Sequence, residues 1–250
     1  MLIDSWFIIV PLIAGAAFFV KAMTGFGPAL IFVSLGAQVL APHTVIPVSA
    51  MLDATAGIIL SFVDPIHGGR RFWIPPAVAI VLGSFVGGLL LGSMSADLLR
   101  LVLGVTIVVL AGWFAFFRSR LHDGSLRDVL PERSTAPDAF IAGAGGVLGG
   151  LTGISGPPLL WHFGRKFGKK PLRQILIPVF LFAAVARVAT YGGTGMITEE
   201  VVRAYLVALP GLLVGTYLGN RVFLRINERT FSRAIGLVLL ASGVRLLLSL

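Results

Sequence analysis

The sequence predicts an all-α, polytopic helical membrane protein whose two halves are homologous. Hydrophobic residues make up 56% of its 250 residues and charged residues only 12%, about half the charged share of soluble domains. The hydrophobic residues fall in long runs, the longest of them close to the ~20 residues that a helix needs to cross ~30 Å of hydrocarbon. Two matching glycine-proline motifs, one in each half, indicate an internal repeat.

The first half contains five apolar stretches before the one long polar segment. The first stretch follows Asp4 without the basic residues of a signal peptide, so we expect it to be retained. Unbroken apolar runs also exclude the alternating pattern of a transmembrane barrel. The five stretches are residues 6–20, 28–40, 45–63, 72–92 and 98–117.

The second half repeats this series after the polar segment. We therefore divide the chain into an N-terminal membrane repeat at residues 1–117, a cytoplasmic linker at 118–138 and a C-terminal membrane repeat at 139–250. The stretches of the second repeat are residues 140–151, 157–163, 175–190, 201–219 and 231–250.

Landmarks recur in the same order in both halves, which indicates a duplication. The offsets between them are nearly constant, at 129 to 132 residues. The pairs are Gly27-Pro28 with Gly156-Pro157, Pro42 with Pro171, and Gly83 and Gly87 of "GSFVGG" with Gly215 and Gly219 of "GTYLGN".

The basic residues predict the orientation of the helices. Four loops hold 15 of the 20 Lys and Arg residues, and loops of this kind face the cytoplasm. They follow the third and fifth stretches of the first half but the second and fourth of the second half, which indicates inverted repeats. Inversion needs an odd number of crossings per half, so we expect a broken or re-entrant first element in each. The competing picture is two parallel four-helix halves.

The two motifs, "TGFGP" and "TGISGPP", predict a binding site for an anion. Glycine permits a sharp unwinding of the helix, and proline suits the first position of the helix that restarts. The restarted helix presents free N–H groups and the positive end of its dipole. The alternative is that glycine and proline serve only close packing. The candidate substrate-binding residues are Thr24, Gly25, Gly27, Pro28, Thr152, Gly153, Ser155, Gly156, Pro157 and Arg187.

Charged residues inside apolar runs are the second functional signal, because they are costly in a membrane. Asp53 and Arg187 both lie within such runs, and the repeat offset brings them near each other. Arg187 is the candidate to hold an anion, and Asp53 the candidate to carry a coupling proton. The alternative is a purely structural ion pair. Lys21 either faces the same cavity or snorkels to the interface, and His162 fits an interfacial residue better than a proton relay.

The sequence contains no motif that indicates a function other than transport. We see no catalytic constellation, no metal-ligating cluster, no P-loop and no nucleophile elbow, and the chain has no cysteine. We therefore expect no enzyme activity, no cofactor and no metal. The net charge of +9 is explained by basic cytoplasmic loops rather than by nucleic acid binding.

Together, the Gly-Pro motifs, the duplicated halves, the two glycine stretches and the central polar linker resemble the TauE/SafE family of sulfite exporters, across essentially the whole chain. The resemblance implies about eight membrane helices in two related halves, in the bacterial inner membrane. It also implies transport of sulfite, organosulfonates or related sulfur-containing anions.

We therefore expect a secondary transporter of small anions that alternates access around a site at the membrane midplane. Its partners would be the anion, the lipid bilayer and a coupling proton, and an oligomer is compatible with the sequence. A passive anion channel and a non-transporting membrane scaffold are the alternatives.

Overall fold

The computed structural model describes residues 6–25, 27–63, 70–116 and 131–222. These ranges form helices joined by short connections and contain no β-strand. The last predicted stretch, 231–250, and most of the linker lie outside the described residues. The helices are α1 (Trp6–Thr24), α2 (Pro28–Gly36), α3 (Pro42–Val63), α4 (Arg70–Ser93), α5 (Ala96–Phe116), α6 (Ala136–Thr152), α7 (Gly156–Gly164), α8 (Lys169–Gly193) and α9 (Glu199–Val222).

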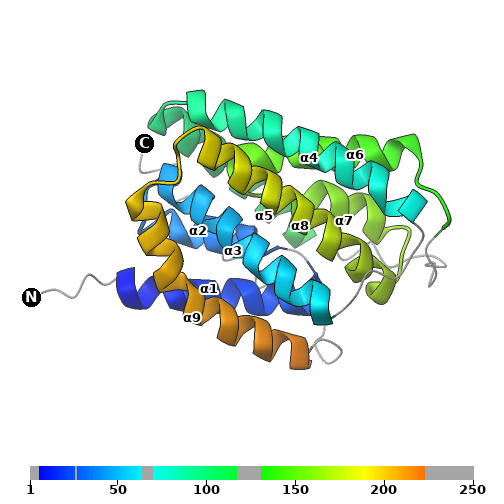
Figure 1. Cartoon of the computed structure of the whole chain (residues 1–250), viewed down its shortest axis with the longest axis horizontal. Coiled ribbons are helices and arrows are strands. Elements are labelled where there is room, and N and C mark those ends of the chain that lie inside the picture. The colour runs from blue at the N-terminus through cyan, green and yellow to red at the C-terminus, as the bar shows by residue number, and fades with distance from the viewer. Residues whose placement is uncertain (1–5, 26, 64–69, 117–130, 223–250) are drawn as a thin grey trace, which may run out of the picture.

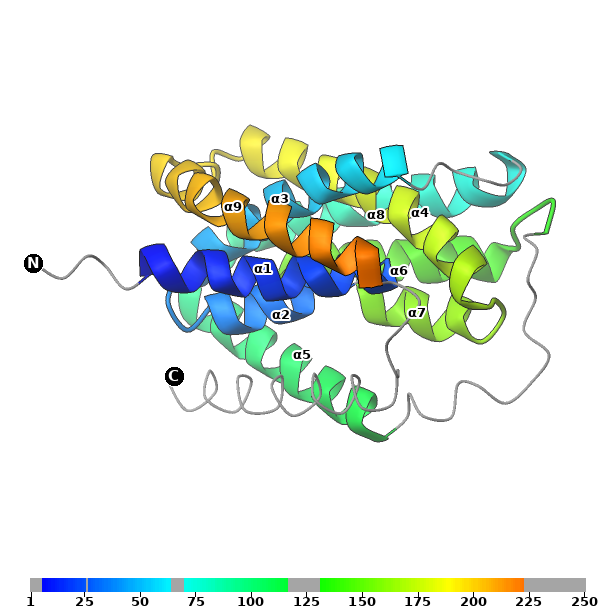
Figure 2. The ribbon, with the colours of Figure 1, turned by 90° about the horizontal axis from the view of Figure 1, so that it is seen from below.

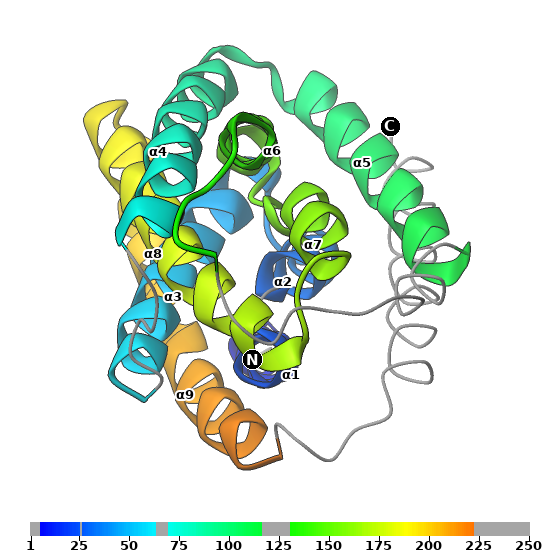
Figure 3. The same ribbon diagram turned by 90° about the vertical axis from the view of Figure 1, so that its right-hand side faces the viewer.

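The helices lie in two rows when the molecule is viewed along them. One row holds α4, α8, α3 and α9, and the other holds α6, α7, α2 and α1, with α5 on the far side (Figure 3). The rows join at their ends, where α4 packs against α6 and α9 packs against α1. Figure 2 shows this second pair side by side. The short helices α2 and α7 thus lie at the centre of the molecule.

The long helices run in two opposite directions. In Figure 1, α1, α3 and α9 run from left to right, whereas α4, α6 and α8 run from right to left. α1 therefore runs opposite to α6, α3 opposite to α8 and α4 opposite to α9.

Five of the described helices are long and apolar enough to cross a membrane: α1, α3, α4, α8 and α9. Their outward faces carry large exposed hydrophobic side chains, such as Leu12, Phe62 and Leu82. Such faces are unfavourable in water but are solvated by lipid tails. The structure is that of a helical membrane protein.

Several helix boundaries differ from those predicted by hydrophobicity. α3 begins at Pro42 rather than residue 45, because proline is well suited to the first turn of a helix. α2 ends at Gly36 rather than residue 40, since the chain turns there to enter α3. α8 covers Lys169–Gly193 rather than 175–190, because a helix continues past the hydrocarbon into its polar flanks.

Glycines bring the joined helices of the two rows into close contact. A Cβ on Gly83 of α4 would lie 2.2 Å from the carbonyl oxygen of Gly143 on α6, and one on Gly215 of α9 would lie 2.2 Å from that of Gly15 on α1. No side chain fits at either place. Small residues of this kind let membrane helices approach closely, so these glycines serve packing.

Candidate functional site

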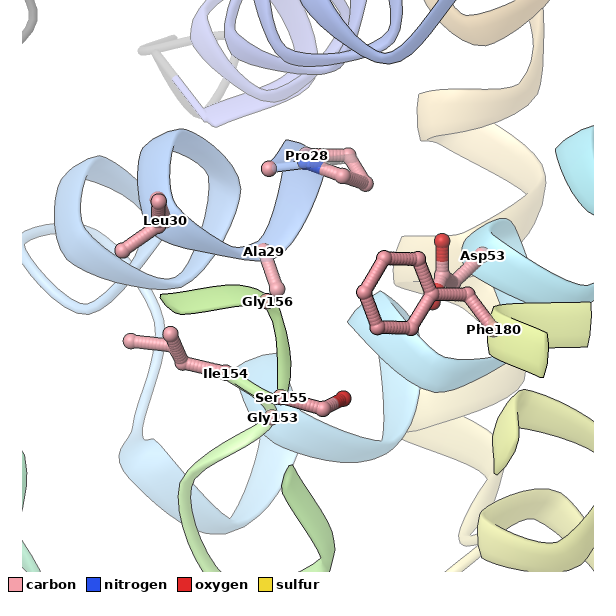
Figure 4. Close-up of a pocket in the computed structure, with 10 residues that line it drawn as sticks. Pro28, Ala29, Leu30, Asp53, Gly153, Ile154, Ser155, Gly156 and Phe180 are labelled. Carbon is pink, nitrogen blue, oxygen red and sulfur yellow. The ribbon is translucent and has the colours of Figure 1, made fainter. Parts of the chain in front are cut away.

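The two helix breaks meet at one small cavity. One break lies between α1 and α2 and the other between α6 and α7. Figure 4 shows Pro28 and Ala29 at the start of α2 facing Ser155 and Gly156 of the second break, with Asp53 of α3 to one side. The cavity is lined by Gly27, Pro28, Ala29, Leu30, Asp53, Gly153, Ile154, Ser155, Gly156 and Phe180.

The breaks form because glycine and proline make continuation of the helix unfavourable there. Gly25 and Gly27 have φ angles of +79° and +88°, and Gly153 has a φ of +81°. This left-handed region strains any residue with a Cβ. Pro28 then opens α2, and Pro157 lies in the first turn of α7, where a missing N–H costs nothing.

Both short helices point their N-termini at the cavity, but they offer different numbers of donors. The first four N–H groups of a helix have no partner within it. In α2 these belong to Gly27, Ala29 and Leu30, since Pro28 has none. Proline fills two of the four positions in α7, which leaves Ser155 and Gly156. The cavity therefore has partial positive charge on both sides, with more donors on the α2 side.

A cluster of three charged side chains lies beside the cavity. The carboxylate of Asp53 forms one ion pair with the Lys21 ammonium and another, at 2.8 Å, with Nη2 of Arg187. Lys21 and Arg187 are completely buried, and Asp53 is 5% exposed. Two cations facing one carboxylate give the cluster a net charge of +1. Buried charges of this kind are costly unless paired, and here one positive charge has no negative counterpart within the cluster.

Backbone oxygens of the second helix break hold Arg187 in place. Its Nη1 donates to the carbonyl oxygen of Gly153 at 2.8 Å and points toward that of Gly149 at 3.5 Å. Its Nε is buried and has no hydrogen-bond partner among the described residues. One turn further on, the hydroxyl of Tyr191 donates to the carbonyl oxygen of Gly150 at 2.5 Å. α8 is therefore tied to the end of α6 by polar contacts.

The structure brings most of the predicted site residues together. Six of them line the cavity: Gly27, Pro28, Asp53, Gly153, Ser155 and Gly156. Gly25, Thr152, Pro157 and Arg187 are buried next to it without lining it, and the side chain of Thr24 is outside the described part of the chain.

Two sequence expectations are refined by the contacts. The hydroxyl of Thr152 donates to the carbonyl of Leu148 and accepts from the N–H of Ile154, so it shapes the break rather than facing the cavity. Lys21 does not snorkel, because it is completely buried and paired with Asp53.

Four cavity residues carry no signal in the sequence. Ala29, Leu30, Ile154 and Phe180 line the cavity, yet each is one apolar residue among many in its stretch. Phe180 is one of 18 phenylalanines. Only the packing of α8 against α3 brings it to the site.

His162 belongs to a separate cluster at the far end of α7. Its Nε2 lies 2.6 Å from Oδ1 of Asp138, and the Lys166 ammonium donates to the same oxygen at 2.7 Å. Among the described residues, no group of three or more His, Cys, Asp or Glu side chains could hold a metal ion.

Comparison with known proteins adds to this geometry. The family model described as Sulfite exporter TauE/SafE matches residues 10–246. A probable sulfite/organosulfonate exporter TauE from Cupriavidus necator is 28% identical, over 94% of this chain and 91% of its own length. A probable inner membrane transporter protein TsaS from Comamonas testosteroni is 28% identical, over 78% of this chain and 80% of its own length. No solved structure matches the chain.

Proposed function

Because the chain belongs to the sulfite exporter TauE/SafE family, we propose that it is a secondary transporter of small sulfur-containing anions such as sulfite or organosulfonates. It is a multi-pass protein of the inner membrane, in line with the relative from Comamonas testosteroni and with its five long apolar helices. The name of the relative from Cupriavidus necator supports the substrate class and the direction of export.

The observation that carries the proposal is the meeting of two helix N-termini and a cationic cluster at one buried cavity. Each element favours a negative ligand: the N–H groups by hydrogen bonding, the dipoles by their field and the cluster by its net charge. Discontinuous helices with this geometry bind anionic groups of substrates in other transporters. We assign binding to these N–H groups and to Arg187.

Alternating access would follow from two inverted repeats. The opposite directions of α1 and α6, α3 and α8, and α4 and α9 support such repeats. α1 and α3 run the same way, so α2 would lead the chain back as part of a re-entrant unit. The three helices α3, α4 and α5 would then cross the membrane and bring the chain to its other side. The second half would start from that side and be inverted. This arrangement gives the first half the odd number of crossings that the basic loops require.

The size of the cavity favours a gated transporter over a passive channel. Its volume is about 20 Å³, and a single water needs at least ~10–15 Å³ by the same measure. A sulfonate is larger than one water, so the helices must move before it binds. The structure would then be a closed state of the cycle, with Asp53 as the group that responds to protons.

Uptake into proteoliposomes tests the proposal. Labelled sulfite and a small labelled organosulfonate would be offered with and without an imposed pH gradient. We expect the gradient to drive accumulation by the wild type and not by Arg187→Ala. Arg203→Ala is the matched control, because Arg203 lies on α9 with its side chain 62% exposed.

Other outcomes separate the alternatives. Flux that equilibrates the anion but never accumulates it would favour a channel. Absence of both flux and binding in folded wild-type protein would favour a membrane scaffold and contradict the proposal.

A further inference from the structure

Asp53 lines the cavity and pairs with the two cations that could bind an anion. Neither Lys21 nor Arg187 lines the cavity. Both carboxylate oxygens of Asp53 are occupied, Oδ1 by Lys21 and Oδ2 by Arg187. An anion that enters the cavity in this state meets a carboxylate first, and like charges in a buried site repel strongly. In the closed state the Asp53 carboxylate therefore opposes binding of an anion, although the helix N-termini and the two cations favour it.

Both cations have a second anchor that does not involve the carboxylate. Lys21 also donates to the main-chain oxygen of Asp53 at 3.0 Å, and Arg187 donates to the carbonyl of Gly153 at 2.8 Å. If the Asp53 side chain turned away, these hydrogen bonds would keep both cations in place. Preorganised groups of this kind bind a ligand without a further ordering cost.

We propose that the Asp53 carboxylate is a built-in competitor of the transported anion, which takes its place between Lys21 and Arg187 once Asp53 is protonated. This rests on the proposed function and adds Lys21 to the residues that bind the substrate. A sulfonate or hydrogensulfite group presents two oxygens to the two cations, as the carboxylate does, and a third to the N–H groups of the helix breaks.

The charge balance of the exchange selects a singly charged anion. Protonation of Asp53 raises the cluster from +1 to +2, and binding of a monoanion restores +1. The buried charge is then the same before and after, which avoids a large desolvation penalty. One proton enters with one anion, so the exchange is electroneutral.

The titratable groups around Asp53 are few. Lys21 faces it from α1 and Arg187 from α8, and Tyr191 lies one turn from Arg187 with its hydroxyl on Gly150. From α9, Tyr205 bonds to Thr55 of α3. The cavity-lining residues of α2 and α7 are not titratable.

Equilibrium binding of labelled methanesulfonate to the detergent-purified, full-length protein tests the inference. This probe keeps its single negative charge between about pH 5 and about pH 8, so any pH dependence belongs to the protein. If protonated Asp53 is the competent form, the apparent Kd of the wild type should rise by about tenfold per pH unit once Asp53 ionises. Asp53→Asn should bind independently of pH and at least as tightly as the wild type at the acidic end.

The role of Lys21 in binding the anion is tested in the Asp53→Asn variant, which lacks the competing carboxylate. Lys21→Met alone leaves Arg187 and Asp53 paired and weakens binding, but it risks misfolding. Lys21→Met combined with Asp53→Asn leaves one buried cation, Arg187, and should bind about tenfold or more weakly than Asp53→Asn. Lys166→Met is the control, because Lys166 lies in the other cluster with its side chain 38% exposed.

Three results would overturn the inference. They are a pH-dependent Kd in Asp53→Asn, loss of binding in folded Asp53→Asn, and equal affinity of Asp53→Asn with and without Lys21→Met. If the wild type accumulates sulfite but binds methanesulfonate equally well at every pH, the inference fails and the proposed function stands. If the folded wild type neither binds nor transports these anions, both fail.

Discussion

Asp53 and Asp138 are each bound by two basic side chains, but the surroundings of the two carboxylates differ. Asp53 lies midway along α3, beside the cavity, and its partners Lys21 and Arg187 are completely buried. Asp138 lies in the first turn of α6, outside the five candidate spans. One of its partners, Lys166, has a side chain that is 38% exposed.

Asp138 has hydrogen bonds that tie it to the helix start. One of its oxygens accepts from the N–H of Thr135 at 2.7 Å and from the Thr135 hydroxyl at 2.8 Å. Burial raises the pKa of Asp138, but hydrogen bonds from Lys166, from the Thr135 backbone, from His162 and from the Thr135 hydroxyl outweigh it and lower the pKa to about 2. Asp138 therefore stays ionised and fixed at neutral pH.

The comparison shows what separates an exchangeable ion pair from a structural one. Both carboxylates have two basic partners, so the number of partners does not determine whether a ligand can replace the carboxylate. Asp53 borders a cavity, and its cations are anchored elsewhere, so a ligand can replace it. Asp138 caps a helix, so its displacement would leave backbone groups unpaired. Each prediction below tests one side of this contrast.

The largest effect is expected for Arg187→Met. This change removes the hydrogen bonds from Arg187 to Asp53 and to the carbonyl of Gly153. Each should contribute ~1.5–3 kcal/mol to the stability of the fold, because the donor is charged. Thermal unfolding in detergent measures it, and anion uptake should be lost as well. Arg203→Met, on the exposed face of α9, should cost ~0–1 kcal/mol. Equal melting and uptake in the two variants would contradict the contrast.

Gly149→Ala should disturb the Asp53 site without changing any charge. The new Cβ would lie 2.4 Å from Oγ of Ser155 and 3.2 Å from its Cα, so the second break must shift, at a cost of ~1–3 kcal/mol. Uptake should fall because Ser155 lines the cavity. Gly143→Ala on the same helix is the control, since its Cβ would have no neighbour closer than 3.6 Å. A normal uptake rate in Gly149→Ala would mean that the break tolerates displacement.

Asp138→Asn should destabilise the fold less than the two changes above and leave transport intact. Loss of the cap should lower stability by ~0.5–2 kcal/mol at neutral pH. Because the folded pKa of Asp138 lies below its usual value, its contribution is complete above about pH 4 and is lost as the pH falls toward about 2. The difference in melting temperature between wild type and variant should therefore close over that range. If the difference in melting temperature persists at low pH, the lower stability of the variant does not come from loss of the carboxylate charge.

The smallest effect is expected for Lys166→Met. Its ammonium is partly exposed, and ion pairs that reach solvent contribute ~0–1 kcal/mol. Melting should therefore change little, and the small change should shrink further in high salt. If Lys166→Met lowers the melting temperature as much as Arg187→Met does, the Asp138 cluster resembles the Asp53 cluster.

Local sequence features predicted the membrane class and the position of the helix breaks. Long apolar runs identify spanning helices whatever their neighbours, and Gly-Pro steps interrupt a helix through their own backbone preferences. Helix ends were predicted less well, since helices such as α8 continue into polar flanks.

The sequence by itself determined that this is a helical membrane protein with two broken helices and charged residues at Asp53 and Arg187. Only the tertiary structure decided that Lys21 is buried on Asp53, that Phe180 lines the cavity and that Arg187 does not. The repeat offset predicted that Asp53 and Arg187, 134 residues apart, lie near each other, but it carried no information on Lys21 or Phe180. Their positions depend on how α3, α8 and α1 pack, and in a membrane the apolar faces of a helix carry no mark of which neighbour they meet.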